Sequence, residues 1–252
     1  MIETTLEDGI ATVRLASPST ANALTPAAFA ELSARIAELQ QPGSGARVLV
    51  LTGSGKVFSA GANLDVLGDT DAKTLARDIT DALLPLQRVL HDGRLPTVAA
   101  VNGAAVGGAV GLALLCDIVV AARSARFSMV FARLGLVPDT GLTHTLPRLV
   151  GEARARALLM TGADIGADEA AAIGMIHRCF DDETFAAQTQ ALAAQLAQLP
   201  SAGHRLTRGA LATGRHSCLE AQMQHEARLQ AERVLSDDFR AAMAAFAARR
   251  KA

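Results

Sequence analysis

The chain has 252 residues, half of them apolar, so it is long enough to bury a large core without disulfide or metal support. Its 24 basic and 25 acidic side chains leave a net charge of −1, without a long block of one sign. The balanced charge and the absence of Trp and Tyr argue against a nucleic-acid partner.

The cysteines and the amino-terminal segment indicate the compartment. Cys116, Cys179 and Cys218 are odd in number and far apart, which fits neither a disulfide framework nor a zinc site. Met1 begins no signal-peptide pattern, and the longest apolar run, 109–115, is too short to span a bilayer. We therefore expect a cytoplasmic protein with no bound metal and no membrane partner.

In chain order, strand and helix signals alternate from the start. The stretches 2–6 and 10–15 flank Asp8-Gly9, a typical hairpin turn. Thr25-Pro26 predicts a helix start, since apolar residues then recur at helical spacing through Leu39. The next expected elements are a buried strand at 48–51, a helix at about 75–90, a strand at 97–101, a helix at 107–115 and a strand at 117–122. This alternation predicts an α/β fold.

The last quarter of the chain has a different pattern. From about residue 181 onward, strand signals vanish and helical stretches rich in Ala, Gln and Leu follow. The stretches are broken at 200–201 and at 236–238. We predict an α/β core over residues 1–195 and a C-terminal helical region over residues 196–252.

Two corners made of small residues are the most informative motifs. Phe58–Leu64 reads FSAGANL and Val101–Ala109 reads VNGAAVGGA, each after an apolar strand. Such corners turn backbone N–H groups towards a ligand without obstruction by side chains, so the two together are able to hold one oxyanion. Either corner alone is more typical of an ordinary tight turn between a strand and a helix. A dinucleotide site is disfavoured, because residues 103–111 lack the G-x-G-x-x-G register.

The paired corners resemble the crotonase (enoyl-CoA hydratase/isomerase) superfamily, where they polarise an acyl-CoA thioester carbonyl. The resemblance implies a spiral of ββα units with a C-terminal helical oligomerisation region that packs in trimers, often paired into hexamers. It implies an acyl-CoA thioester substrate, with coenzyme A as part of that substrate and no prosthetic group. Further matching segments cover almost the whole chain: Ser17-Pro18, Asn22–Leu24, Cys116-Asp117, Ala125–Phe127, Gly135–Pro138, Leu146–Gly151 and Ala245–Lys251.

The same resemblance assigns binding roles to individual positions. It places the two oxyanion donors on the N–H groups of Ala62 and Gly108. It gives the segment around residues 18–24 backbone contacts to the adenine end of coenzyme A. Phe246 and Arg249 would cover the nucleotide from a neighbouring subunit, although an amphipathic terminal helix explains both residues equally well. The implied coenzyme A contacts are Ser19, Ala21, Ala60, Phe246 and Arg249.

The catalytic carboxylates of hydratases are missing from the matching positions. Hydratases of this family activate water with two glutamates, and the corresponding residues here are Gly111 and Phe131. Asp139, in the run Gly-Leu-Val-Pro-Asp, stands where ring-opening and double-bond-shifting isomerases of phenylacetate-type pathways carry their catalytic aspartate. Locally, Asp139 also fits a helix N-cap. It further resembles the nucleophile of aryl-CoA dehalogenases, which the lack of Trp and Tyr disfavours.

The favoured prediction is therefore an enoyl-CoA isomerase in which Asp139 is the base. The alternatives are an enoyl-CoA hydratase that uses Asp139 to activate water, and an inert acyl-CoA-binding member of the family. His144 is either a helper acid or a packed side chain, and Lys56 and Arg126 are either coenzyme A phosphate contacts or surface charges. Residues 66–95 are expected to line the acyl end of the site.

Overall fold

The computed structural model describes residues 2–63 and 71–249. Within that part, some side chains lie outside the description: those of Ala72, Leu75, Ala245, Ala248 and Arg249. The chain divides into two compact units, Met1–Ala197 and Gln198–Ala252. The candidate catalytic residues all belong to the first unit.

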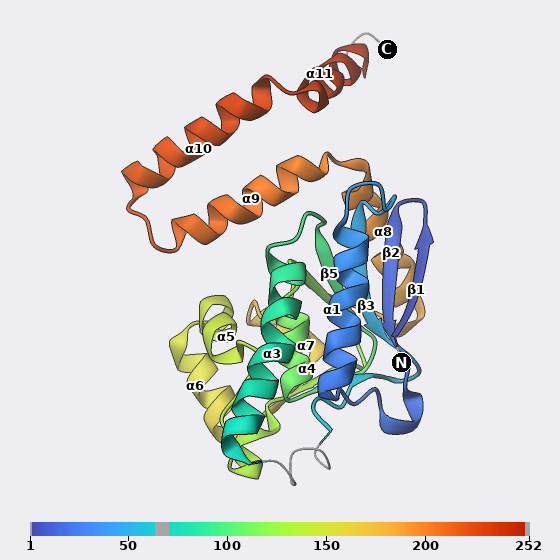
Figure 1. The fold of residues 1–252 in the computed structure, drawn as a ribbon, viewed down its shortest axis with the longest axis vertical. Helices are drawn as coiled ribbons and strands as arrows, with labels where there is room; N and C mark the ends of the chain where they lie inside the picture. Colours follow the sequence, from blue (N-terminus) through green and yellow to red (C-terminus); the bar gives the residue numbers. More distant parts are fainter. Residues whose placement is uncertain (1, 64–70, 250–252) are drawn as a thin grey trace. The chain divides into compact units, whose positions relative to one another are not determined.

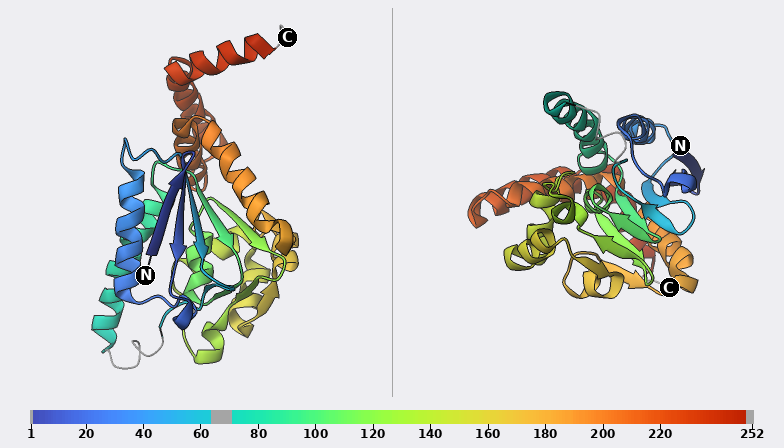
Figure 2. Two further views of the ribbon diagram at one scale, coloured as in Figure 1. Left: turned by 90° about the vertical axis from the view of Figure 1, so that its right-hand side faces the viewer. Right: turned by 90° about the horizontal axis from the view of Figure 1, so that it is seen from below.

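The first unit is built on a six-stranded sheet with the order β1-β2-β3-β5-β7-β10 (Figures 1 and 2). The predicted hairpin is present, since β1 and β2 pair antiparallel, and every other neighbouring pair is parallel. The strands are β1 Ile2–Glu7, β2 Ile10–Leu15, β3 Val48–Gly53, β5 Thr97–Val101, β7 Ile118–Ala122 and β10 Arg178–Phe180.

Helices cover both faces of this sheet because alternate strand residues are buried on opposite sides. Val48 and Val50 pack with Ala193 of one helix, whereas Leu49 and Leu51 join the larger core on the other face. Figure 2 shows the sheet between these layers. The helix on the first face is α8 Asp182–Gln198, and those on the second are α1 Pro26–Gln40, α3 Ala72–His91 and α4 Gly108–Leu114.

A second, four-stranded sheet has the order β4-β6-β8-β9. The chain passes three times from the large sheet to this small sheet and then to a helix: β3-β4-α3, β5-β6-α4 and β7-β8-α5. This repetition confirms the predicted spiral of ββα units. These strands were not predicted from the sequence, because three residues are too few to show a period. They are β4 Val57–Ser59, β6 Ala104–Val106, β8 Arg126–Ser128 and β9 Asp164–Gly166.

The first unit also contains short helices, and one of its long helices starts earlier than expected. Helix α3 begins three residues earlier than expected, because the Asp71 side chain caps it by accepting from the backbone N–H groups of Lys73 and Thr74. The other elements are the 3-10 helices η1 Pro18–Thr20 and η2 Val130–Leu134, with α5 Leu142–Val150, α6 Glu152–Thr161 and α7 Ala167–Ala172.

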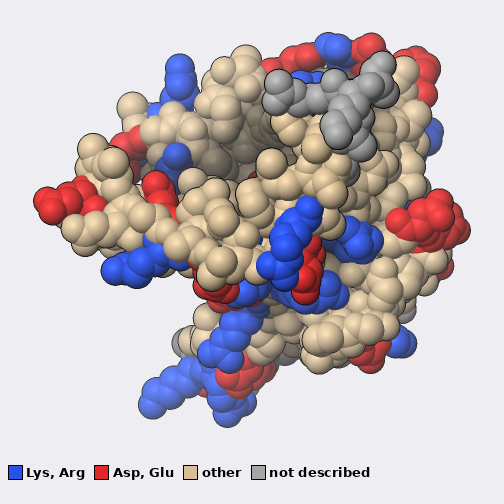
Figure 3. Space-filling view, turned by 90° about the horizontal axis from the view of Figure 1, so that it is seen from above, with Lys and Arg blue, Asp and Glu red and all other residues tan. Residues whose placement is uncertain are grey.

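The second unit consists of helices α9 Ser201–Gly214, α10 Leu219–Val234 and α11 Asp237–Arg249. The expected breaks coincide with the starts of α9 and α11, but the break between Gly214 and Leu219 was not foreseen. None of the side chains described in this unit is buried. Among the helices that the structure describes in either unit, none is both long and apolar enough to span a membrane. On the face shown in Figure 3, acidic and basic side chains are interspersed.

Candidate functional site

A buried asparagine holds the first corner. Asn22 lies in the left-handed region with φ +55°, and its amide nitrogen donates to the carbonyl oxygens of Ser54 at 3.0 Å and Val57 at 2.9 Å. The backbone carbonyl oxygen of Asn22 accepts from the Ser59 hydroxyl at 2.8 Å, and the oxygen of that hydroxyl accepts from the Gly61 N–H at 3.0 Å. This network ties the segment after β2 to the turn that carries Ala62. Asparagine tolerates the left-handed region, so the sequence carried a signal for this turn, but the prediction for residues 18–24 was limited to backbone contacts with coenzyme A.

Ala62 forms an isolated parallel β-bridge with Leu24, but its own N–H takes no part in the hydrogen bonds of that bridge. The Leu24 N–H donates to the Gly61 carbonyl at 2.7 Å, and the Asn63 N–H donates to the Leu24 carbonyl at 3.0 Å. Both bonds therefore involve the neighbours of Ala62. Within residues 2–63 and 71–249, the Ala62 N–H donates to no protein acceptor. It is half-buried and available to a ligand oxygen.

The two corners come together at Gly61. This residue has φ +81°, and a methyl group placed on it would stand 2.4 Å from the Val106 carbonyl oxygen and 3.5 Å from the Gly108 nitrogen. Only glycine allows so close an approach of the two backbones. Consequently Ala62, which follows Gly61, lies beside the turn that starts α4.

The second corner opens a helix. Gly107 has φ +56° and donates its N–H to the Ser128 carbonyl at 2.9 Å, which anchors the turn to β8. Gly108 is the first residue of α4, so its N–H has no partner within the helix. It also donates to no acceptor elsewhere in the described chain. The ring of Phe131 closes one side, because a methyl group on Gly107 would lie 3.7 Å from its Cζ.

The carboxylate of Asp139 lies next to this second corner. A methyl group placed on Gly108 would stand 3.1 Å from Asp139 Oδ1 and 3.0 Å from Thr140 Oγ1. Asp139 does not cap α5, whose N-cap residue is Gly141, with no side-chain capping bond. Its oxygen instead accepts from the Thr140 hydroxyl at 2.7 Å. The N-cap interpretation is therefore excluded.

The surroundings of Asp139 favour its protonated form more than water does. Burial raises the pKa of Asp139 above its ordinary value, and the hydrogen bond from the Thr140 hydroxyl opposes part of that rise. No charged side chain among the described residues contributes to the shift. A half-buried carboxyl with a raised pKa is a suitable proton acceptor near neutral pH.

The structure also explains why no second carboxylate stands nearby. A methyl group on Gly111 would meet Thr140 Cβ at 2.7 Å and the Thr140 carbonyl oxygen at 2.9 Å. A glutamate at this position would therefore displace the loop that carries Asp139. The other hydratase position holds Phe131, whose side chain is buried. Of the three positions 111, 131 and 139, only Asp139 therefore carries a carboxylate.

An apolar cavity of about 260 Å³ lies beside Thr140. Its walls carry no charge, and most of them come from α3, within the range expected to line the acyl end. Residues 66–70, part of the same expected range, lie outside the described residues. The lining residues are Ile79, Thr80, Leu83, Leu84, Gln87, Leu115, Thr140 and Gly141.

The structure brings together some of the predicted coenzyme A contacts. The Ala60 N–H donates to the Ala21 carbonyl at 2.9 Å, and Ser19 is exposed on η1, two residues before Ala21. Phe246 is exposed on α11 in the second unit. The side chain of Arg249 lies outside the described residues.

The remaining candidates have surface positions. His144 is exposed on α5, Lys56 is exposed between β3 and β4, and Arg126 is exposed on β8. Over the described part of the chain, no three His, Cys, Asp or Glu side chains gather into a possible metal site.

Comparisons with known proteins define the class. The sequence profile of the family described as Enoyl-CoA hydratase/isomerase matches residues 5–252. A probable enoyl-CoA hydratase of Rhodobacter capsulatus is 40% identical over 245 residues, covering 97% of this chain and 94% of that protein. A 1,2-epoxyphenylacetyl-CoA isomerase of Escherichia coli is 37% identical over 250 residues, again covering 97% and 94%.

A solved structure supports the same assignment. The enoyl-CoA hydratase of Bacillus anthracis superposes with a TM-score of 0.93 at 27% identity, covering 98% of this chain and 96% of that one. The chain therefore belongs to the enoyl-CoA hydratase/isomerase family. It is an acyl-CoA-processing enzyme with the crotonase fold, and both hydration and isomerisation occur among the names of its relatives.

Proposed function

We propose that this protein is an enoyl-CoA isomerase, which shifts a double bond in an enoyl-CoA thioester with Asp139 as the base. The observation that carries the proposal is the position of the Asp139 carboxylate beside Gly108, with Gly111 and Phe131 where a hydratase needs glutamates. One carboxylate is enough for isomerisation, whereas the family's usual hydration uses two.

The proposed reaction moves one proton and one double bond. Asp139 accepts a proton from the α- or γ-carbon of the acyl chain, and the electron pair of that C–H bond moves into a dienolate. The negative charge on the thioester oxygen is stabilised by the N–H groups of Ala62 and Gly108. Protonated Asp139 then returns its proton to the other carbon, so nothing is added to or lost from the substrate.

A hydratase is the second candidate, because one relative at 40% identity carries that name. In this reading, Asp139 would activate a water molecule and the product would be a 3-hydroxyacyl-CoA. The buried ring of Phe131 and the packed contact between Gly111 and Thr140 speak against a site that holds water between two carboxylates. An inert acyl-CoA-binding protein is disfavoured, because a binding pocket needs no half-buried carboxylate beside its oxyanion donors.

The experiment is a product assay on 2-enoyl, 3-enoyl and ring-epoxide CoA thioesters in deuterated water, read by mass and NMR. Isomerisation gives a shifted double bond, with deuterium at the α- or γ-carbon. Hydration instead adds solvent oxygen, and an inert binder gives no product. Asp139→Asn should reduce proton exchange roughly 10²- to 10⁴-fold while leaving acyl-CoA binding nearly unchanged.

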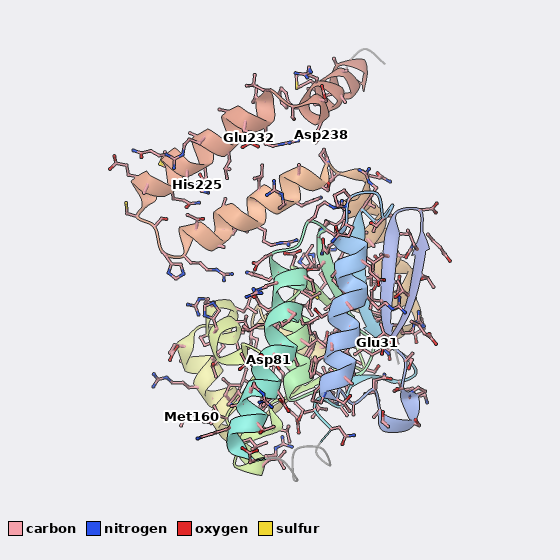
Figure 4. The ribbon with its side chains drawn as sticks, viewed as in Figure 1. Glu31, Asp81, Met160, His225, Glu232 and Asp238 are labelled. Carbon is pink, nitrogen blue, oxygen red and sulfur yellow. The ribbon has the colours of Figure 1, made fainter. Side chains whose placement is uncertain are left out.

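The matched control is Asp81→Asn, which removes an exposed carboxylate from α3 (Figure 4). Asp81 does not line the cavity beside Thr140, so this variant should exchange protons at the wild-type rate. Retained exchange in Asp139→Asn would exclude Asp139 as the base.

We extend the proposal to coenzyme A and to assembly. The backbone around Ser19, Ala21 and Ala60 is proposed to contact the adenine end of the substrate, and Phe246 with Arg249 to cover it from a neighbouring subunit of a trimer or hexamer. The hydrogen bond between Ala60 and Ala21 supports the first part, since it unites two of these segments. The exposed position of Phe246 on α11 supports the second.

A further inference from the structure

Thr140 has a backbone conformation that its side chain disfavours. Its φ is +53°, in the left-handed region, which is unfavourable for a residue with a Cβ relative to glycine. A β-branched residue is particularly rare there. Gly141, the next residue, also has a positive φ of +71°, so the whole turn before α5 is left-handed. Strain of this kind persists where surrounding contacts fix the residue, and it often accompanies function.

Packing against α4 fixes Thr140. The residue is buried, and its Cβ and carbonyl oxygen lie so close to Gly111 that a methyl group there would collide with both. Its Oγ1 would stand 3.0 Å from a methyl group on Gly108. Thr140 therefore sits against α4 at both glycines, and its side chain has little freedom to rotate.

The fixed hydroxyl in turn orients the neighbouring carboxylate. Thr140 Oγ1 donates to Asp139 Oδ1 at 2.7 Å. Among the described residues, no other side chain donates to either oxygen of this carboxylate. We propose that Thr140 is the positioning residue of the site: its hydroxyl fixes the Asp139 carboxylate beside Gly108 in the ionised form that accepts the substrate proton. This inference rests on the proposed function of Asp139.

Other groups packed around the pair do not supply this interaction. The α3 side chains that line the cavity beside Thr140 are uncharged. The ionisable residues of α3 all lie outside that lining: Lys73, Arg77, Asp78, Asp81, Arg88 and His91. The side from η2 carries the Phe131 ring, α4 contributes Gly108 and Gly111, and Leu115 directly follows α4. On α5 the nearest titratable side chain is His144, which is exposed and whose carbonyl oxygen accepts from Arg148 at 2.6 Å.

The test compares three replacements of Thr140. Thr140→Val keeps the shape and removes the hydroxyl, Thr140→Ser keeps the hydroxyl, and Thr140→Gly removes the hydroxyl and the backbone strain together, so that a folded protein is available even if valine disturbs the turn. Thr145→Val is the matched control, because the exposed Thr145 hydroxyl donates only to the Gly141 carbonyl at 3.2 Å on the same helix.

In the exchange assay, the valine and glycine variants should lose roughly 10- to 100-fold in kcat with little change in KM. The acidic limb of their pH profile should move to higher pH, because removing a donor to the charged carboxylate raises its pKa. Thr140→Ser and Thr145→Val should behave like the wild type. A valine variant with an unchanged pH profile, or a serine variant as impaired as valine, would overturn the proposal.

A second measurement separates this inference from the proposed reaction. Carbon NMR of carboxyl-labelled aspartate, with Asp139→Asn to identify the signal, follows the titration of Asp139 without any turnover. If no substrate reacts but Thr140→Val still raises the pKa of Asp139, the hydroxyl orients this carboxylate and only the proposed reaction fails. If the pKa is the same in both proteins, the positioning role fails even when the enzyme is an isomerase.

Discussion

The two units of the chain use their apolar residues in opposite ways. In the first unit, leucines such as Leu32, Leu86 and Leu112 are fully buried between the sheet and its helices. In the second unit, Leu219 and Leu235 are 76% and 75% exposed, and none of the described side chains is buried. The first unit thus has a core of its own, and the second is made of helices without one.

This difference is consistent with the proposed roles of the two units, catalysis for the first and assembly for the second. The first unit contains Ala62, Gly108 and Asp139, so its packing determines the geometry of the candidate site. Helices of 13 to 16 residues are marginal by themselves in water, because tertiary packing normally stabilises them. The second unit therefore needs contacts beyond its own helices, which is consistent with the proposed role in a trimer or hexamer.

The largest expected effect is the loss of assembly when the second unit is removed. A chain that ends at Ala197 should unfold cooperatively but run as a monomer, whereas the full chain should have the mass of a trimer or hexamer. Light scattering after size-exclusion chromatography measures both masses, and denaturant titration measures the folding. If the shortened chain assembled as the full chain does, the assembly contacts would belong to the first unit.

Adding one methyl group to each unit should show that the first unit is tightly packed and the second is not. Gly61→Ala should lower the free energy of unfolding by about 2–5 kcal/mol, because the new Cβ meets the Val106 carbonyl at 2.4 Å and φ is positive. It should also separate the oxyanion donors and impair proton exchange. Urea unfolding and the exchange assay measure these effects.

The matched control for this change is Gly209→Ala on α9. A methyl group there meets nothing within 4 Å, and alanine favours the helix by about 1 kcal/mol. The unfolding of the first unit should be unchanged. Equal losses in the two variants would show that both units pack with the same density.

The sequence predicted the parts of the fold that have a period. The strand β3 is a continuous apolar run and the helix α1 shows a 3.6-residue repeat, and both were found within a few residues. The three-residue strands of the small sheet have no period to read. The start of α3 was predicted three residues too late, because the Asp71 side chain caps the helix before its apolar repeat begins.

The parts of the site that lie in a local sequence motif were predictable, whereas the contacts between distant segments were not. The two corners and Asp139 were selected from sequence, and their assigned roles stay predictions. The packing of Thr140 on Gly111 and the Asn22 network join segments about 30 residues apart, so neither was visible in local sequence. Gly111 was interpreted only as a missing glutamate, whereas its lack of a side chain is what admits the loop of Asp139.

Truncating one leucine in each unit tests the same difference in packing between the two units. Leu112→Ala on α4 should destabilise the protein by about 2–5 kcal/mol, because Leu112 is fully buried. Leu235→Ala, at the end of α10, should change the unfolding of the first unit by less than about 0.5 kcal/mol. Denaturant unfolding of both variants measures the difference. A cost for Leu235→Ala as large as that for Leu112→Ala would mean that the exposed leucine is buried in the assembled protein.

The smallest expected effect is that the ionised Asp139 carboxylate lowers the free energy of unfolding of the first unit. Burial raises the folded-state pKa of Asp139, so the folded protein binds this proton more tightly than the unfolded chain does. The stability that protonation provides is complete below the unfolded-state pKa of about 3.9 and is lost as the pH rises through the raised folded value.

Asp139→Asn, which stays neutral, should therefore be more stable than the wild type at pH 7, and the advantage should shrink as the pH falls towards 4. Urea unfolding of both proteins across this range measures it, with Asp81→Asn as the control that shows no such pH-dependent advantage. An Asp139→Asn variant that is less stable than the wild type at pH 7 would mean that the ionised carboxylate gains more from the Thr140 hydroxyl than it loses by burial.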